Sequence, residues 1–214
     1  YMVTIVNSIN KPIENSINNG FIKKAENKLK SFNNLKVIGI TGSYGKTTTK
    51  YIVSSILSQK YNTLMTPASF NTTLGVVRTI NEKLEPMHEV FVCEMGAKNV
   101  GDIKEICDIV KPEYGILTAI GPQHLESFKT LENVQKTKME LIDSLPDNGW
   151  AFVNNEDENI QKINFKKNNV KYGLNNNSEY YAYNIKIEET GSVFDVHTPT
   201  EEIKNIKTKL LGEH

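Results

Sequence analysis

Cysteine is scarce in this chain of 214 residues, which contains only Cys93 and Cys107. The two cysteines form neither a CxxC motif nor a metal-ligand spacing, so a disulfide framework and a cysteine-based metal site are not indicated. A reducing compartment is the simple interpretation, and we therefore expect a cytoplasmic protein.

Long apolar runs are also missing. The sequence has no stretch of about 18 apolar residues, which a membrane-spanning helix requires, and no leader of the signal type. Lysine plus arginine and aspartate plus glutamate each total 25, so the formal net charge is zero. Without an excess of positive charge, binding to nucleic acid or to an anionic membrane is not favoured. We expect a monomer whose ligands bind at local sites.

The composition predicts one globular domain with a small appendage. Hydrophobic residues make up 38% of the chain and charged residues 23%, which allows a sizeable core. Residues 18–32 resemble a basic amphipathic helix with solvated lysines, whereas residues 2–6 could form a strand or the remnant of a preceding segment. We divide the chain into an N-terminal segment, residues 1–34, and a domain, residues 35–214. Because the chain begins at Tyr1 and not at Met, we expect a piece of a longer protein.

A glycine-rich turn, GITGSYGKTTT at residues 39–49, carries the clearest chemical signal. It follows an apolar run and precedes a helical pattern. Gly42 and Gly45 let the backbone approach phosphate oxygens, Lys46 can reach the outer phosphates, and Thr47 offers a hydroxyl to magnesium. The usual P-loop pattern has a further glycine five residues before Gly45, but that position is Ile40 in this turn. The turn nevertheless predicts a site for ATP or a related nucleotide.

Short apolar runs alternate with helical patterns through the middle of the chain. This rhythm predicts an α/β fold, a P-loop-containing and mostly parallel sheet flanked by helices on both faces. Towards the C-terminal end, alternating polar and apolar residues predict a small antiparallel β meander. The expected strands are residues 35–40, 90–93, 114–118, 150–153, 180–187, 192–197 and 203–210, and the expected helices follow the turn, include residues 100–110 and span residues 131–145.

Three chemically useful side chains lie near the ends of predicted strands, where ligands bind to sheets of this kind. Glu94 ends one strand and could face a nucleotide-bound magnesium ion, although alone it could equally be a surface acid. His124 follows the next strand, and a structural or solvated histidine is the alternative. Lys138 lies on the following helix and by itself would be interpreted as solvated.

Together these residues resemble a known family. The order and spacing of five motifs are similar to those of the central ATPase domain of the Mur ligases, over about residues 35–214. The motifs are TGSYGKTTTK at residues 41–50, NTTLG at residues 71–75, EMGA at residues 94–97, IGPQHLE at residues 120–126 and KTKME at residues 136–140.

The resemblance implies ATP-driven amide bond formation in peptidoglycan precursor synthesis. Two of the motifs most resemble the branch that adds D-Ala-D-Ala to a UDP-N-acetylmuramoyl tripeptide through an acyl phosphate. Family members also carry an amino-terminal domain that binds the UDP sugar and a carboxyl-terminal domain that closes over ATP. Residues 1–34 are too few for the first of these. We therefore expect a fragment that binds nucleotide weakly and cannot complete ligation alone.

The resemblance also implies roles for individual residues. Lys46 would hold the phosphates, and Thr47 and Glu94 would bind one magnesium ion. His124 would help to bind a second, and Lys138 matches a lysine that is carbamylated in several members. Lys46, His124 and Lys138 are the expected catalytic groups, and Lys138 as a carbamate would join the metal site.

The expected nucleotide contacts extend beyond the turn. Asn71 matches an asparagine near the phosphates and the substrate, with a loop cap as the alternative. Asn154 matches a segment near adenine, with a turn as the alternative. The expected nucleotide contacts are Gly42, Ser43, Tyr44, Gly45, Lys46, Thr47, Thr48, Asn71 and Asn154.

Other functions stay open at this point. Related ligases add other amino acids to muramoyl peptides or glutamate to folate, and these motifs separate them only partly. A nucleotide-binding module without catalysis is a different class, but it would be expected to lose His124 and Lys138. A P-loop kinase would need a lid with arginines, and Arg78 is the one arginine of the chain.

Overall fold

The computed structural model describes residues 2–122 and 125–209. Its strands form one sheet in the order β2-β3-β1-β4-β5-β6-β7-β8-β9. Neighbours from β2 to β7 pair in parallel, and β7, β8 and β9 pair antiparallel. The strands are β1 Lys36–Thr41, β2 Thr63–Met65, β3 Val90–Glu94, β4 Tyr114–Leu117, β5 Trp150–Asn154, β6 Asn169–Gly173, β7 Tyr180–Glu188, β8 Gly191–His197 and β9 Glu202–Thr208. The predicted mostly parallel sheet with a terminal meander is confirmed.

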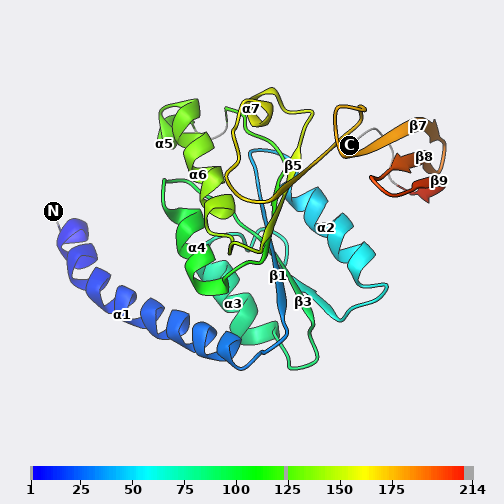
Figure 1. Cartoon of the computed structure of the whole chain (residues 1–214). Helices are drawn as coiled ribbons and strands as arrows, with labels where there is room; N and C mark the ends of the chain where they lie inside the picture. The colour runs from blue at the N-terminus through cyan, green and yellow to red at the C-terminus, as the bar shows by residue number, and fades with distance from the viewer. Residues whose placement is uncertain (1, 123–124, 210–214) are drawn as a thin grey trace.

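Helices connect the parallel strands and cover both faces of the sheet (Figure 1). They are α1 Met2–Lys30, α2 Lys46–Leu57, α3 Thr73–Lys83, α4 Asp102–Val110, α5 Leu125–Phe128, α6 Leu131–Asp143 and α7 Glu158–Gln161. Strands β2 and β6, helix α3 and the short helices α5 and α7 are additions to the elements predicted from the sequence. Each is short or has a weak pattern, which is why periodicity did not reveal them.

The larger part of the core lies on the face that α1, α3, α4 and α6 cover. Ile80 of α3, Ile106 of α4 and Leu141 of α6 are fully buried there against Phe91 of β3. Alternate residues of the same strands, such as Val92, face the other side, where α2 packs. Because successive side chains of a strand point to opposite faces, each strand contributes to both layers.

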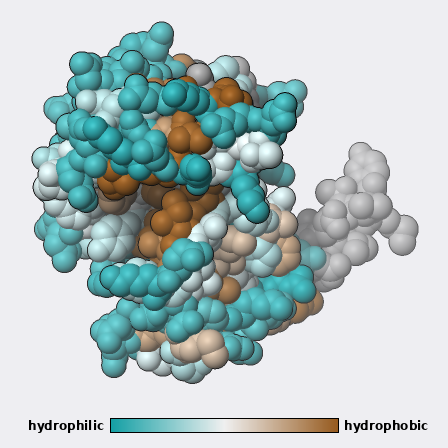
Figure 2. Space-filling view, turned by 90° about the vertical axis from the view of Figure 1, so that its right-hand side faces the viewer, coloured by the Kyte–Doolittle hydropathy of each residue, from teal (hydrophilic) through white to brown (hydrophobic). Residues whose placement is uncertain are grey.

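A groove of about 1210 Å³ remains on the face that carries α2. It is lined by Val53 and Leu57 of α2, by Ile38 of β1, and by residues around the first positions of β3 and β4, including Val90 and Tyr114. Figure 2, which views the right-hand side of Figure 1, shows apolar surface gathered in a hollow. The groove therefore lies towards the amino ends of the strands, away from the glycine-rich turn.

The N-terminal segment is a single long helix, and its amino-terminal half extends away from the domain (Figure 1). The strand considered for residues 2–6 is therefore wrong. The solvated interpretation of the lysines is wrong for Lys28, whose Nζ donates to the carbonyls of Ile80 at 2.9 Å and Asn81 at 3.1 Å. An ammonium group near the C-terminal end of α3 interacts favourably with the last carbonyls of that helix, although the carbonyl of Ile80 also accepts the amide of Leu84. Helix α1 is therefore attached to the domain by charge as well as by packing.

The strand order reverses at β1, and this places the candidate site. Strand β1 pairs with β3 on one side and with β4 on the other. Ile40 is beside Glu94 in one pairing and Thr41 is beside Leu117 in the other. The carboxyl ends of three strands thus meet at a switch point, where sheets of this type bind ligands.

Candidate functional site

The glycine-rich turn connects β1 to α2, and two of its glycines have backbone conformations that other residues rarely adopt. Gly42 has φ +153°, and a Cβ there would lie 2.0 Å from Thr118 Oγ1. Gly45 precedes α2 with φ +78°. At position 42 there is no room for a Cβ atom, and at position 45 the backbone conformation favours glycine. The turn can therefore lie flat against the end of β4.

Ser43 and Tyr44 attach the turn to the segment that follows β4. The amide of Ser43 donates to the carbonyl of Ala119 at 2.8 Å, and its buried hydroxyl pairs with the backbone of Gly121 at 2.9 to 3.0 Å. The ring of Tyr44 lies against Gly121, where an added Cβ would be 2.6 Å from its edge. The Ser43 side chain is thus occupied within the protein, whereas Tyr44 is about half exposed.

The first turn of α2 presents unpaired donors. In the part of the chain that the structure describes, the amides of Gly45, Lys46 and Thr47 donate to no other group. Lys46 Nζ donates to the carbonyl of Gly42 at 2.7 Å, so its ammonium group lies over the turn. Burial lowers the pKa of Lys46, while the charge of Glu94 opposes that shift. Free amides and a lysine at a helix start form an anion-binding site. Thr48 is exposed on the same turn of the helix.

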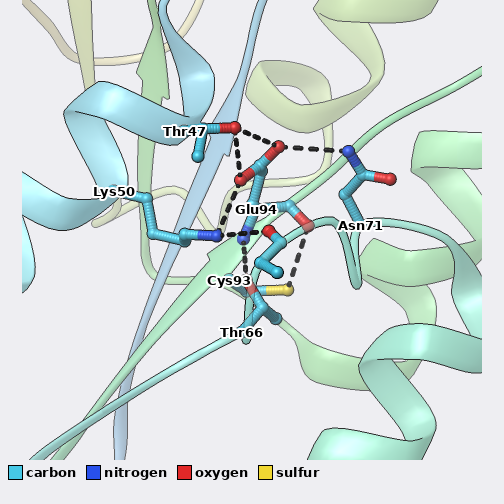
Figure 3. Close-up of polar contacts among 7 residues, drawn as sticks. Thr47, Lys50, Thr66, Asn71, Cys93 and Glu94 are labelled. Atoms are coloured by element: carbon cyan, nitrogen blue, oxygen red, sulfur yellow. Dashed lines mark hydrogen bonds and ion pairs between the residues drawn. The ribbon is translucent and has the colours of Figure 1, made fainter.

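Glu94 is the centre of a polar cluster at the end of β3 (Figure 3). The residue as a whole is 1% exposed. Thr47 Oγ1 lies 3.1 Å from both carboxylate oxygens, and Asn71 Nδ2 donates to Oε1 at 3.1 Å. The backbone amide of Glu94 donates to Thr66 Oγ1 at 3.0 Å. The structure thus brings together Thr47, Asn71 and Glu94, which are far apart in the sequence, and Thr72 rather than Asn71 caps helix α3.

Lys50 completes this cluster, although the sequence analysis assigned it no role. Its Nζ lies 2.9 Å from Glu94 Oε2, and both side chains are almost fully buried. The same ammonium group donates to the carbonyl of Ala68 at 2.7 Å. One signal could have identified it. Lys50 lies one helical turn after Lys46, so both lysines lie on the same side of α2, although only Lys50 is fully buried.

Lys138 is buried in α6, with 2% of its surface exposed. The solvated interpretation of this residue is therefore wrong. The structure records no hydrogen bond or ion pair for its ammonium group within the described residues. Burial, and to a smaller extent the positive charge of Lys46, lower the pKa of Lys138 to about 8. The effect of Lys46 shows that the two lysines share one electrostatic environment.

Asn154 and Asp157 hold the segment after β4 in place. Asn154 Nδ2 donates to the carbonyl of Thr118 at 3.0 Å, and Asn154 Oδ1 accepts the amide of Glu156 at 3.0 Å. Asp157 Oδ2 accepts the amide of Ile120 at 3.0 Å. The turn geometry weighed for Asn154 is present, and contact with adenine stays a prediction. This segment leads to His124, which lies outside the described residues.

The oxygen donors of the cluster fit magnesium. Glu94 supplies a carboxylate and Thr47 a hydroxyl, and hard oxygen ligands of this kind suit Mg²⁺. No group of three or more His, Cys, Asp or Glu that could hold a metal occurs within residues 2–122 and 125–209. Magnesium commonly keeps water and substrate phosphates as its other ligands, so a small protein ligand set beside a phosphate cradle is suitable.

Comparison with known proteins supports the same interpretation. The sequence matches the Mur ligase middle domain over residues 40–214. The UDP-N-acetylmuramoyl-tripeptide–D-alanyl-D-alanine ligase of Escherichia coli (strain K12) is 33% identical over 183 residues, which are 84% of this chain and 40% of that protein. The ligase of the same name from Buchnera aphidicola (subsp. Baizongia pistaciae, strain Bp) is 36% identical over 186 residues, 85% of this chain and 40% of that protein.

Solved structures agree with the sequence comparison. MurF from Acinetobacter baumannii superposes with a TM-score of 0.83 at 28% identity, covering 92% of this chain and 43% of that one. MurF from Thermotoga maritima in complex with ADP gives a TM-score of 0.80 at 29% identity, covering 89% of this chain and 44% of that one. An FPGS–AMPPCP complex shares the fold alone, at 13% identity.

This chain spans 40% of the length of the curated relatives from E. coli and Buchnera. No helix in the described part of the chain has both the length and the apolar character needed to span a membrane. The family match covers most of the chain, and both relatives exceed 30% identity over more than four fifths of it. The chain therefore belongs to the Mur ligase family.

Proposed function

We propose that residues 35–214 are the ATP-binding middle domain of a ligase that adds D-Ala-D-Ala to a UDP-N-acetylmuramoyl tripeptide. One observation carries the proposal. The buried carboxylate of Glu94 faces the hydroxyl of Thr47, the residue that follows the lysine of the phosphate turn. The names of the relatives supply the substrates, and the site geometry supplies the place for a nucleotide and its metal.

In the proposed reaction, a terminal carboxylate oxygen of the tripeptide attacks the γ-phosphorus of ATP, and ADP leaves. The amine of D-Ala-D-Ala then attacks the acyl carbon of the resulting acyl phosphate. The carbon–oxygen bond to phosphate breaks, the amine loses a proton, and an amide and inorganic phosphate result. Lys46 and the free amides of Gly45 and Thr47 would hold the phosphate oxygens. Their contribution is positioning and charge neutralisation.

Thr47 and Glu94 would hold one magnesium ion, and His124 would help to hold a second. Bound magnesium would neutralise charge that develops on the transferred phosphoryl group. Glu94 is positioned for this role because three side chains fix its carboxylate. Asn71, which donates to the same carboxylate, would hold it beside the phosphates and the substrate.

Lys138 would act as a carbamate. Carbamylation needs an uncharged amine, whose nitrogen attacks carbon dioxide and then loses a proton. A buried lysine with a pKa of about 8 and no partner in the described structure supplies such an amine more readily than an exposed lysine. The product carries a negative charge, which would suit the magnesium ions of the site.

Three further assignments belong to the proposal. Ser43 and Tyr44 of the turn, Thr48 of α2 and Asn154 would contact the nucleotide, with Asn154 near adenine. A monomeric state and a cytoplasmic location stay predictions, which sedimentation and cell fractionation can check. Residues 1–34 would form a helical segment that precedes the middle domain, and α1 supports this division.

The test has two parts. A chimera carries residues 35–214 in place of the matching segment of the E. coli relative, and its phosphate release is measured with ATP and UDP-muramoyl tripeptide, with and without D-Ala-D-Ala. Release that requires both substrates supports the ligase. Nucleotide binding is measured both on the 214-residue chain and on the chimera, so a misassembled chimera is recognised by its loss of ADP binding and does not decide the outcome. Divalent-dependent ADP binding without ligation in the chimera would favour a non-catalytic nucleotide-binding module.

A further inference from the structure

Lys50 makes two contacts that hold it in one place. Its ammonium group lies between Glu94 Oε2 at 2.9 Å and the carbonyl of Ala68 at 2.7 Å. The side chain is fully buried, so water cannot replace either contact. Ala68 has a positive φ of 33°, which is uncommon for a residue with a Cβ. The loop around Ala68 is therefore held in a conformation that aims a carbonyl at Lys50.

The two oxygens of Glu94 consequently have different environments (Figure 3). Oε2 faces the Lys50 ammonium group, whereas Oε1 accepts from the neutral amide of Asn71 at 3.1 Å. Thr47 lies 3.1 Å from each oxygen, but its hydroxyl has a single proton and can donate to only one of them at a time. The charge-assisted contact is the stronger one. Oε1 is therefore the oxygen that can turn to a cation more easily.

We propose that Lys50 is a positioning residue that sets metal specificity, because it restricts Glu94 to binding a divalent cation through Oε1 alone. This inference rests on the proposed function, since it concerns the same nucleotide-bound cation. A cation that approached Oε2 would meet the fixed positive charge of Lys50, and like charges repel strongly where water is excluded. Glu94 would then act as a ligand with one oxygen.

One-oxygen coordination favours Mg²⁺ over Ca²⁺. Magnesium is small, takes six ligands in a strict octahedron and is commonly bound by single carboxylate oxygens together with water and phosphate. Calcium takes six to eight oxygen ligands and readily accepts both oxygens of one carboxylate. Removing the Lys50 charge frees Oε2 and should allow Glu94 to bind Ca²⁺ with both oxygens.

The experiment measures ADP binding to the 214-residue chain by calorimetry, with either Mg²⁺ or Ca²⁺ as the divalent cation. The quantity compared is the ratio of the two ADP dissociation constants. For the natural sequence we expect Mg²⁺ to support binding about tenfold better than Ca²⁺. For Lys50→Met we expect this preference to fall by roughly tenfold, in line with the effect of residues that orient metal ligands.

Ser54→Ala is the matched control, because Ser54 lies one helical turn further along α2, is buried, and has a hydroxyl without a partner in the described structure. It should leave the ratio unchanged. A merely structural role for Lys50 would weaken binding with both cations equally and preserve the ratio. That result would overturn the inference.

The natural chain provides a second arm that does not depend on the folding of a variant. If Ca²⁺ supports ADP binding by the natural chain as well as Mg²⁺ does, Glu94 is not restricted and the inference is wrong. If ADP binds with no dependence on any divalent cation, the inference and the metal site of the proposed function fail together. If ADP binding depends on a divalent cation but Lys50→Met leaves the ratio unchanged, the inference is wrong and the metal site of the proposed function is unaffected.

Discussion

Lys50 and Glu94 form an ion pair, 2.9 Å between Nζ and Oε2, in which the side chains are 0% and 2% exposed. Burying two charges is costly, and their attraction offsets that cost only when both are present and well bonded. The contacts to Ala68, Thr47 and Asn71 supply the additional bonds. The pair is therefore sensitive to the loss of either member.

Lys50→Met should lower the free energy of unfolding by about 3–5 kcal/mol, because it leaves a buried carboxylate without its counter-charge. Adding Glu94→Gln to that variant should restore much of the stability, since both charges are then gone. Urea denaturation without metal measures both. Lys36→Met is the control, because Lys36 forms an exposed pair with Glu113 and should change stability little. If Lys50→Met and Lys36→Met lowered the free energy of unfolding equally, burial of the Lys50–Glu94 pair would not be what makes it sensitive.

Gly42→Ala should abolish ADP binding, because the new Cβ would lie 2.0 Å from Thr118 Oγ1 and 2.9 Å from the amide nitrogen of Ala119. Gly45→Ala should be milder, since its Cβ would meet nothing closer than 3.7 Å and only the backbone strain of a positive φ, of order 1–3 kcal/mol, remains. Titration calorimetry gives the comparison. Gly20→Ala, in open space on α1, should leave binding intact and stabilise the helix by about 0.5–1 kcal/mol. Stronger loss from Gly45→Ala than from Gly42→Ala would show that strain, not space, governs the turn.

Lys138 makes stability depend on pH. Its pKa falls from 10.5 to about 8 on folding, so below pH 8 both states are protonated and the folded state bears a cost on the order of 3 kcal/mol. Between pH 8 and 10.5 the unfolded chain binds more protons, so the stability of the natural chain rises with pH.

Lys138→Met should therefore be more stable than the natural chain at pH 7, with a difference that shrinks towards pH 10. Urea denaturation at several pH values, in buffers free of carbon dioxide, measures that difference. Lys136→Met replaces an exposed lysine of the same helix and serves as the control. A Lys138→Met advantage that stays constant from pH 7 to pH 10 would be evidence against a depressed pKa.

Asp157 caps α7 and also holds the segment after β4. Its Oδ1 accepts the amides of Asn159 and Ile160, and its Oδ2 accepts the amide of Ile120. Asp157→Ala should reduce stability by about 1–2 kcal/mol through loss of the cap. Asp157→Asn keeps one acceptor oxygen and should retain the cap while releasing Ile120.

Amide hydrogen exchange separates the two effects. Protection of the Ile120 amide should fall in both variants, and protection of the Ile160 amide should fall only in Asp157→Ala. Unchanged exchange at Ile120 in Asp157→Asn would show that the carboxylate does not hold the segment.

The candidate site was predictable where its chemistry is local. The turn around Gly42 and Gly45 was recognisable because glycine, lysine and threonine at this spacing after an apolar run are typical of phosphate binding. Glu94 was a reasonable prediction because the ends of parallel strands meet at one edge of a sheet. Lys50 was missed, since a lysine in a helix is usually solvated and nothing local shows that a strand end carries its partner.

The glycine-rich turn, the alternation of strands and helices, and the family could be predicted from the sequence, because each depends on residues that are close in the chain or in a fixed order. The tertiary structure alone decided which charged groups are buried and which are paired. Lys28, Lys50 and Lys138 have similar side chains, yet one binds carbonyls at a helix end, one neutralises Glu94 and one has no partner in the described structure. Burial and pairing depend on what the fold brings alongside, so they cannot be read from local sequence.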